Sequence, residues 1–194
     1  TQGQVRDASS LVIDWDRENV TIDKLNEVKK ADIGSLPIVE SYDSIAPCVC
    51  KERIGKFICI GLNYSDPAEE PGMKVPPEPI IFAQATSAVI GPNDDIEIPK
   101  KSVKSDWEVE LGVIIGKEAK YISESESQSH IAGYCVINDL SEREFQIEHS
   151  GQWVKGKSCD TFGPIGPYLV TTDEISDPQN LKMWLEVNGK TMQN

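Results

Sequence analysis

The chain has 194 residues, of which 39% are hydrophobic and 26% charged, a composition typical of a folded globular protein. Its formal net charge of −13 makes nucleic acid and anionic membrane surfaces poor partners and favours a bound cation. The longest apolar runs, FICIGL and LGVIIG, are far shorter than the roughly 20 residues that a membrane-spanning helix needs.

The first fifty residues are expected to form a separate N-terminal region, 1–50, that contains one helix. In TIDKLNEVKK, Ile22, Leu25 and Val28 fall on one helical face, and Thr21 suits the N-cap position. Residues 51–194 are expected to form the main domain.

Strands predominate in the main domain, and the predicted fold class is mainly β with short helices (α+β). The expected strands lie in KFICIGLNY, PIIFAQATSAVIGP, DIEIP, WEVELGVIIG, IAGYCVIND, YLVTT and LKMWLEVNGKTMQN. Ser123-x-x-Glu126 and Ser141-x-x-Glu144 match the capping box, so we expect a short helix after each serine.

The two ends of the sequence suggest further chain. Asn188-Gly189 predicts a hairpin turn, but only KTMQN remains for the returning strand. The sequence also begins at Thr1 rather than at a methionine. We therefore expect a natural protein that extends beyond both ends, with the C-terminal strands of its sheet missing from this sequence.

The five cysteines are an odd number, and Cys59 and Cys135 lie inside apolar runs. Cys48 and Cys50 form a C-x-C pair, which is not a usual zinc spacing, and the chain has only two histidines. The cysteines are therefore interpreted as structural thiols, and a reducing, cytoplasmic location is expected.

Two glutamates stand in the otherwise apolar strand DWEVELGVII. Because side chains alternate along a strand, Glu108 and Glu110 are expected on one face, about 7 Å apart. A third carboxylate, Asp139, ends the apolar strand YCVIND. Nearby buried carboxylates need a cation or a proton, and an all-oxygen site suits Mg²⁺, Mn²⁺ or Ca²⁺. The alternative is a solvated acidic strand and an unrelated aspartate, and spacing alone leaves both interpretations open.

The segment GKSCDTFGPIGP, residues 156–167, has neither helical nor strand periodicity. Its glycines and prolines are typical of a surface turn. The same loop could present Lys157 and backbone N–H groups to an anionic ligand.

These segments together resemble the fumarylacetoacetate hydrolase family. The matching strings are GLNYSDPAEE, PIIFAQATSAVIGP, DWEVELGVIIGK, AGYCVINDLSEREFQ and GQWVKGKSCDTFGPIGP, in family order from about residue 56 onward. The chain looks most like bacterial hydrolases of 2,4-diketo-3-deoxy sugar acids, whose relatives are often named ureidoglycolate lyases or hydroxyheptadienedioate isomerases. The resemblance implies a coiled β-roll around a metal site, and usually a homodimer.

The resemblance also implies roles for individual residues. Glu108, Glu110 and Asp139 match the metal ligands, with Mg²⁺ the usual ion and Mn²⁺ or Ca²⁺ as alternatives. Lys157 matches a lysine that faces the substrate, and Gln146 matches a glutamine beside the bound acid. The substrate implied is a small 2-oxo or 2,4-diketo acid.

The chain departs from the family pattern at two positions. In NYSDPAEE, Pro67 stands where the family has the histidine of its water-activating pair, while Glu70 matches the partner glutamate. Proline has no group that titrates, so Glu70 is left as the expected catalytic base. Gln84 stands where relatives usually have lysine, a substitution that removes a positive charge near the expected pocket. Neutral sequence change in a loop is the alternative explanation for both departures. At Pro67, however, the residue that is replaced has a chemical role.

Three functions follow as hypotheses. The first is a divalent-metal-dependent hydrolase that cleaves a C–C bond in an acylpyruvate-like acid through a metal-bound enolate, with activity weakened by Pro67. The second is a metal-dependent lyase, decarboxylase or tautomerase acting on a 2-oxo acid, which needs no hydrolytic water. The third is an inactive relative that still binds metal.

Overall fold

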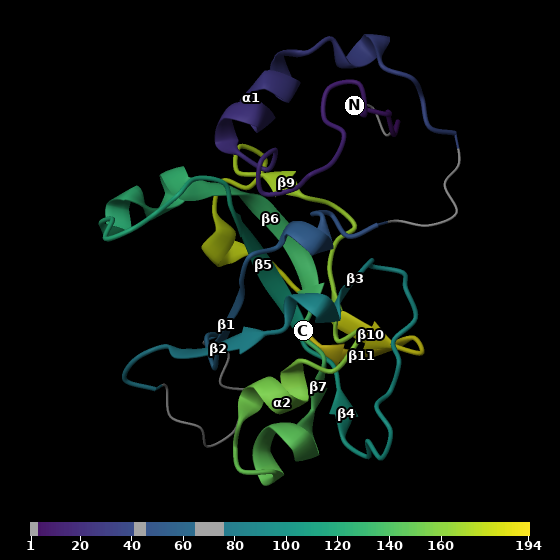
Figure 1. Cartoon of the computed structure of the whole chain (residues 1–194), viewed down its shortest axis with the longest axis vertical. Coiled ribbons are helices and arrows are strands. Elements are labelled where there is room, and N and C mark those ends of the chain that lie inside the picture. Colours follow the sequence, from purple (N-terminus) through teal and green to yellow (C-terminus); the bar gives the residue numbers. More distant parts are fainter. Residues whose placement is uncertain (1–3, 41–45, 65–75) are drawn as a thin grey trace.

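The structure, a computed structural model, describes residues 4–40, 46–64 and 76–194 (Figure 1). The strands in these ranges are β1 Phe57–Gly61, β2 Ile80–Gln84, β3 Val89–Ile90, β4 Ser105–Asp106, β5 Val109–Ile115, β6 Ile131–Asn138, β7 Ser141–Glu142, β8 Gly163–Pro164, β9 Val170–Thr171, β10 Leu185–Val187 and β11 Lys190–Gln193. The helices are α1 Ile22–Lys30 and α2 Trp153–Lys157, with a π-helical turn at Glu144–Glu148 and 3₁₀ turns at Ile33–Ser35, Lys51–Arg53, Thr86–Ala88, Glu124–His130 and Pro178–Asn180. The predicted mainly β fold with short helices is confirmed.

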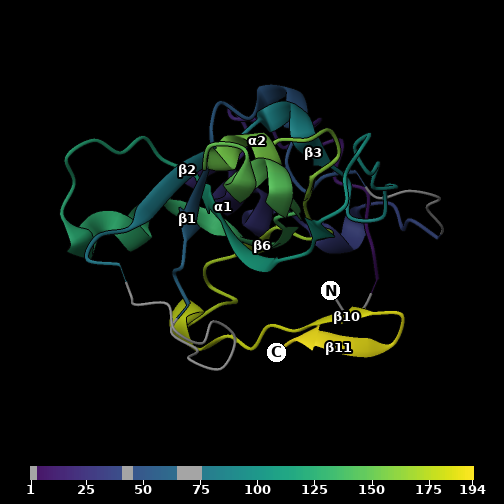
Figure 2. The ribbon, with the colours of Figure 1, turned by 90° about the horizontal axis from the view of Figure 1, so that it is seen from below.

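A three-stranded antiparallel sheet in the order β5-β6-β9 lies at the centre of the molecule. The helices α1 and α2 lie toward opposite ends of the β5–β6 pair (Figure 1). The other described strands pair two by two: β1 with β2, β3 with β8, β4 with β7, and β10 with β11. Figure 2 shows the β10–β11 hairpin set apart from the layer that contains α2.

The hydrophobic core draws on both predicted parts of the chain. Its buried cluster consists of Val20, Val49, Val89, Cys135, Ile137 and Ile165. Val20 and Val49 come from the N-terminal region, and the backbone N–H of Ile22 also donates to Gly116 O. The division at residue 50 stays a prediction, because these contacts describe packing and not independent folding.

Two local predictions are confirmed in detail. Helix α1 begins after Thr21, whose side chain accepts a hydrogen bond from Lys24 N, and Leu25 is buried on the predicted face. The hairpin turn forms at Asn188 and Gly189, which have φ values of 53° and 75°. Positive φ at both central residues is what a two-residue hairpin turn requires, and this explains the Asn-Gly pair.

The two faces of β5 differ in an informative way. Ile114 packs against the core cluster and Gly112 is buried, so the face that also carries Glu110 points inward. On the opposite face, Val113 is 46% exposed and Ile115 is 58% exposed. The glutamate-bearing face of this strand is therefore not a wet outer surface.

Two sequence predictions are wrong. The expected strand in DIEIP has no strand partner among the described residues, and Glu97 N donates to the Thr161 side chain instead. Ser141 does not cap a helix, because it belongs to β7, pairs with Asp106 and donates its hydroxyl to Asp139 O at 3.3 Å. The expected helix after Ser123 does form as a 3₁₀ turn with a complete capping box.

All five cysteines are free thiols. None of the helices in the described ranges has the length and hydrophobicity that crossing a lipid bilayer requires. The reducing, cytoplasmic location stays a prediction.

Candidate active site

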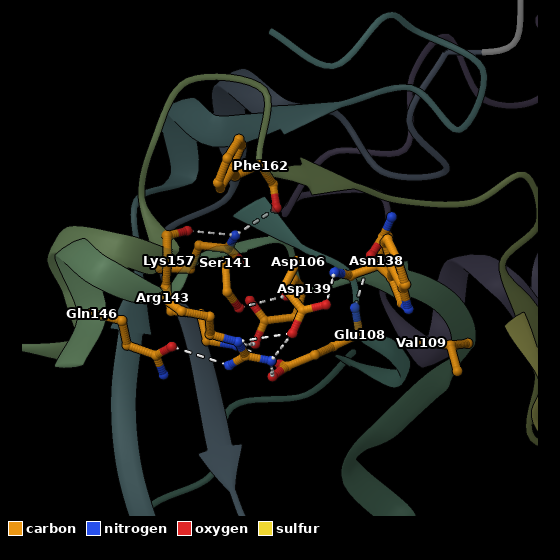
Figure 3. A network of polar contacts seen from close by, with 12 residues as sticks. Asp106, Glu108, Val109, Asn138, Asp139, Ser141, Arg143, Gln146, Lys157 and Phe162 are labelled. Carbon is orange, nitrogen blue, oxygen red and sulfur yellow. Dashed lines mark hydrogen bonds and ion pairs between the residues drawn. The ribbon is translucent and has the colours of Figure 1, made fainter. Parts of the chain in front are cut away.

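Lys157 is the centre of a buried network of charged groups (Figure 3). Its side chain is only 2% exposed. The ammonium Nζ donates to Asp139 Oδ2 at 2.9 Å and to Glu108 Oε2. The ring of Phe82 lies 5.4 Å from the same nitrogen, a cation–π distance. Lys157 thus joins two of the three predicted metal ligands.

The backbone explains why Lys157 reaches this place. Lys157 is the last residue of α2, which packs against the π-helical turn and β7. A Cβ atom on Gly156 would lie 2.5 Å from Gln146 Cβ and 2.7 Å from Gln146 N, and would also collide with Glu142 O. Only glycine at position 156 allows the helix to approach this closely.

Glu108 and Asp139 are brought together by the pairing of the central strands. Asp139 N donates to Glu108 O at 2.9 Å, and Glu108 N donates to Asn138 Oδ1 at 3.2 Å. The next residue, Val109, donates its backbone N–H to Gln193 Oε1 at 2.8 Å. The site is therefore bonded to β11 as well as to β6.

Arg143 is a member of the network that the sequence analysis missed. Its guanidinium donates to Glu108 Oε1 at 2.6 Å, to Asp106 Oδ2 at 2.8 and 2.9 Å, and to Gln146 Oε1 at 3.0 Å. Gln146 is 2% exposed and lies on the π-helical turn, an element often found at functional sites. The spacing of three residues between Arg143 and Gln146 was the available signal, because such residues share a helical face.

Glu110 lies beside this network and lines a cavity of about 470 Å³, which Asp139 also lines. Burial raises the pKa of Glu110 to about 7. The negative charges of Glu108 and Asp139 contribute to this rise, whereas a hydrogen bond with Tyr64 opposes it. Burial likewise raises the pKa of Asp139, against the opposing effect of the Lys157 ammonium.

The chemistry of the predicted metal ligands suits a divalent cation. All three are carboxylates, and the charges of Glu108 and Asp139 add to burial in raising the pKa of Glu110. Asp139 Oδ1 is buried and has no hydrogen-bond partner among the described residues. Within those ranges no three His, Cys, Asp or Glu side chains converge as a ligand set, and the Lys157 ammonium is bonded to two of the carboxylates. The donor types therefore fit a divalent cation. In this structure, the Lys157 ammonium bridges the Glu108 and Asp139 carboxylates.

The remaining predicted residues fall into two groups. Pro67 and Glu70 lie outside the described residues, so the role of Glu70 as catalytic base stays a prediction. Gln84, expected near the pocket, is 2% exposed and donates to the backbone carbonyls of Lys157 and Phe162 at 2.8 and 2.9 Å.

Comparison with known proteins identifies the family of this chain. Residues 56–194 match the model of the fumarylacetoacetate (FAA) hydrolase C-terminal domain. A Burkholderia ambifaria protein, named provisionally as a hydrolase, is 54% identical over 192 residues, which cover 99% of this chain and 67% of that protein.

Two solved structures are also similar. Fumarylacetoacetate hydrolase from Exiguobacterium antarcticum matches with a TM-score of 0.80 and 28% identity, over all of this chain and 68% of that one. The 2-hydroxyhepta-2,4-diene-1,7-dioate isomerase from Mycobacterium marinum matches with a TM-score of 0.64 and 32% identity, over 84% of this chain and 55% of that one. This chain thus spans between about half and two thirds of the length of these relatives.

The mainly β fold is shared with hydrolases and isomerases, which defines the class as enzymes. The chain belongs to the fumarylacetoacetate hydrolase family.

Proposed function

We propose that the protein is a divalent-metal-dependent hydrolase that cleaves a C–C bond in a 2,4-diketo acid of the acylpyruvate type. The observation that carries this proposal is the buried contact of Lys157 Nζ with both Glu108 and Asp139. An ammonium group at a cluster of carboxylates, beside a cavity of about 470 Å³, suits a small acid that binds together with a cation. The names of the hydrolase relatives support the reaction class.

The reaction itself balances simply. Water adds to the acyl carbonyl, and the bond between that carbon and the neighbouring CH₂ breaks. The acyl part leaves as a carboxylic acid, while the electron pair of the broken bond remains on the 2-oxo acid as an enolate. Protonation of the enolate carbon then gives a pyruvate-type product.

Three side chains of this chain have suitable chemistry for binding and orienting such a substrate. Lys157 can donate to a substrate carboxylate or to an oxygen that gains negative charge. The amide of Gln146 can hold the acid group, and Arg143 holds Gln146 and Glu108 in place. Because these groups are largely withdrawn from solvent, their interactions with a developing charge are stronger than they would be in water.

Glu108, Glu110 and Asp139 are the residues that would hold the cation, with Mg²⁺ first and Mn²⁺ or Ca²⁺ as alternatives. When bound, the ion would supply Lewis-acid stabilisation of negative charge on the substrate oxygens. Its charge would also favour the ionised form of Glu110, whose pKa is raised by burial and by its neighbours. Glu70 is proposed as the base that activates water, without the histidine that Pro67 replaces.

The direct test is to incubate the protein with Mg²⁺ and an acylpyruvate. Hydrolysis predicts a fall in the enol absorbance and an equal amount of pyruvate, both abolished by EDTA and strongly reduced in Lys157→Met. Lys155→Met is the matched control, because Lys155 is exposed and lies on the same helix. Pyruvate release that persists in the presence of EDTA would contradict the metal-dependent mechanism.

A second candidate is a metal-dependent isomerase, lyase or decarboxylase acting on a 2-oxo acid. The similarity to the Mycobacterium marinum isomerase favours it, as does Pro67, because these reactions stabilise an enolate without activating water. Loss of oxaloacetate with release of CO₂, or a shift in diene absorbance without formation of pyruvate, would support this candidate over hydrolysis.

The expected homodimer remains part of the proposal. Size-exclusion chromatography with light scattering should give twice the mass of 21.4 kDa that the chain has. A monomer at all concentrations would contradict it.

A further inference from the structure

The end of β2 holds the main chain at Lys157 and in the segment that follows it. Gln84, the last residue of β2, is 2% exposed, and its Nε2 donates to Lys157 O at 2.8 Å and to Phe162 O at 2.9 Å. The neighbouring Ala85 N donates to Ser158 Oγ at 2.9 Å. Figure 3 shows the carbonyls of Lys157 and Phe162 reached by one nitrogen.

The same strand also contacts the far end of the lysine. Phe82 lies two residues before Gln84, and residues two apart in a strand point to the same side. Its ring is 5.4 Å from Lys157 Nζ. One strand therefore contacts Lys157 at both its backbone carbonyl and its charged end.

The hydrogen bonds of Gln84 fit a specific need. Lys157 is the last residue of α2, and the last carbonyls of a helix have no partner within it. A buried carbonyl without a donor is unfavourable, so a side chain with an N–H group is required here. The amide cannot turn around, because its Oε1 would then face two carbonyl oxygens. The Oε1 atom itself is buried with no partner in the described part of the chain.

We propose that Gln84 is a positioning residue, which fixes the end of α2 so that the Lys157 ammonium stays between Glu108 and Asp139. Glutamine supplies the donor without charge, whereas a lysine at this position would bring a second cation close to Lys157. The catalytic meaning of this placement rests on the proposed function, but the placement itself does not.

The test measures the position of the Lys157 ammonium directly. In ¹⁵N NMR, an ammonium group that is buried and bonded to two carboxylates exchanges its protons slowly, and Lys157→Arg assigns its signal. Gln84→Met has a similar length but no donor, so we expect proton exchange at Lys157 to accelerate at least tenfold, with a changed ¹⁵N shift. Gln179→Met, at an exposed glutamine, should leave the signal unchanged.

The results separate this proposal from the proposed function. Unchanged exchange in a folded Gln84→Met protein would overturn the positioning role. If Gln84→Met does not fold, Gln84→Asn provides the same comparison, because its shorter side chain keeps the amide but moves it away from both carbonyls. Where turnover of acylpyruvate is measurable, kcat should fall more than KM changes. If the unaltered protein shows no hydrolysis, the proposed function is refuted. Faster exchange in Gln84→Met would still support the positioning role.

Discussion

The ammonium nitrogen of Lys157 lies 2.9 Å from Asp139 Oδ2, and both side chains are almost fully withdrawn from solvent. Glu108, which the same ammonium also contacts, is 49 residues away in the sequence. A charge buried in this way is stable only while its partners remain in place. The network therefore couples the stability of the fold to the chemistry of the site, and several measurements follow from this coupling.

Removal of the lysine charge should destabilise the protein strongly. Lys157→Met leaves Asp139 and Glu108 without their ammonium partner, so we expect the free energy of unfolding to fall by about 3–5 kcal/mol in urea denaturation. The double variant Lys157→Met, Asp139→Asn should recover part of this loss, because one unpaired charge is then removed as well. Lys155→Met should change stability by less than about 0.5 kcal/mol, as expected for an exposed position. Equal effects at Lys155 and Lys157 would contradict the role of the buried pair.

A divalent cation should stabilise the folded state. At a Mg²⁺ concentration of about 100 times the dissociation constant, binding should add about 2.7 kcal/mol, visible as a rise in Tm. Glu108→Gln and Asp139→Asn should abolish this rise, whereas Glu118→Gln, at an exposed position, should retain it. If Glu108→Gln retains full stabilisation, the proposed ligand set is wrong.

Glu142 should make stability depend on acid pH. Its side chain is fully buried, and although burial raises its pKa, hydrogen bonds from Ser102, from the backbone of Glu144 and from other donors hold the pKa below its usual 4.5. A pKa lowered in the folded state contributes stability that is fully present above about pH 4.5 and is lost as the pH falls below that value.

The matching variant is Glu142→Gln. It should lower the free energy of unfolding at pH 7 by about 1–3 kcal/mol, because several donors lose their ionised acceptor. Its stability should then fall less steeply in acid than that of the unaltered protein. Thermal melts between pH 7 and pH 3 provide the comparison, and parallel curves for the two proteins would show that Glu142 is not the group responsible.

The close packing of α2 predicts that Gly156 tolerates no side chain. Gly156→Ala should destabilise the fold by about 1–3 kcal/mol and displace Lys157, because the added Cβ collides with the neighbouring backbone. Gly55→Ala is the control, since a Cβ there would meet no atom within 4 Å. Urea melts of both variants, together with activity, check this prediction, and an unperturbed Gly156→Ala protein would mean that α2 can move aside.

Position 67 should limit water activation. Pro67→His restores the residue type that relatives use, and positioned general-base catalysis contributes about 10²–10⁴-fold in rate. We therefore expect acylpyruvate cleavage to accelerate within this range, with the gain lost again in Pro67→His, Glu70→Gln. An unchanged rate would contradict the prediction that position 67 limits catalysis.

The sequence correctly predicted those elements whose local residue preferences agree with the tertiary contacts that they make. Thr21 caps α1 and Asn188-Gly189 forms the hairpin turn, because capping and positive φ are local properties of these residue types. The alternation along β5 correctly set Glu110 on a face that is not a wet outer surface. The prediction at Ser141 is wrong, because its capping-box pattern is outweighed by pairing with Asp106, a partner distant in sequence.

The predicted site was incomplete for a similar reason. The two glutamates and Asp139 carry a signal in their own strands, but the lysine that joins Glu108 to Asp139 depends on how α2 packs. Arg143 was missed because an arginine near the start of a helical turn looks like ordinary surface charge. Gln84 was interpreted as a lost positive charge near the pocket, and only the fold reveals its bonds to the carbonyls of Lys157 and Phe162.

The hydrogen bond from Val109 N to Gln193 Oε1 has a practical consequence. Val109, the first residue of β5, stands between Glu108 and Glu110, so the β10–β11 hairpin is hydrogen-bonded to the main chain between these two carboxylates. In a protein whose accessible native thiols have been replaced, a fluorophore attached through Met192→Cys is expected to respond to ligand binding at the site. For the same reason, substitution of Gln193 is expected to perturb the main chain between Glu108 and Glu110.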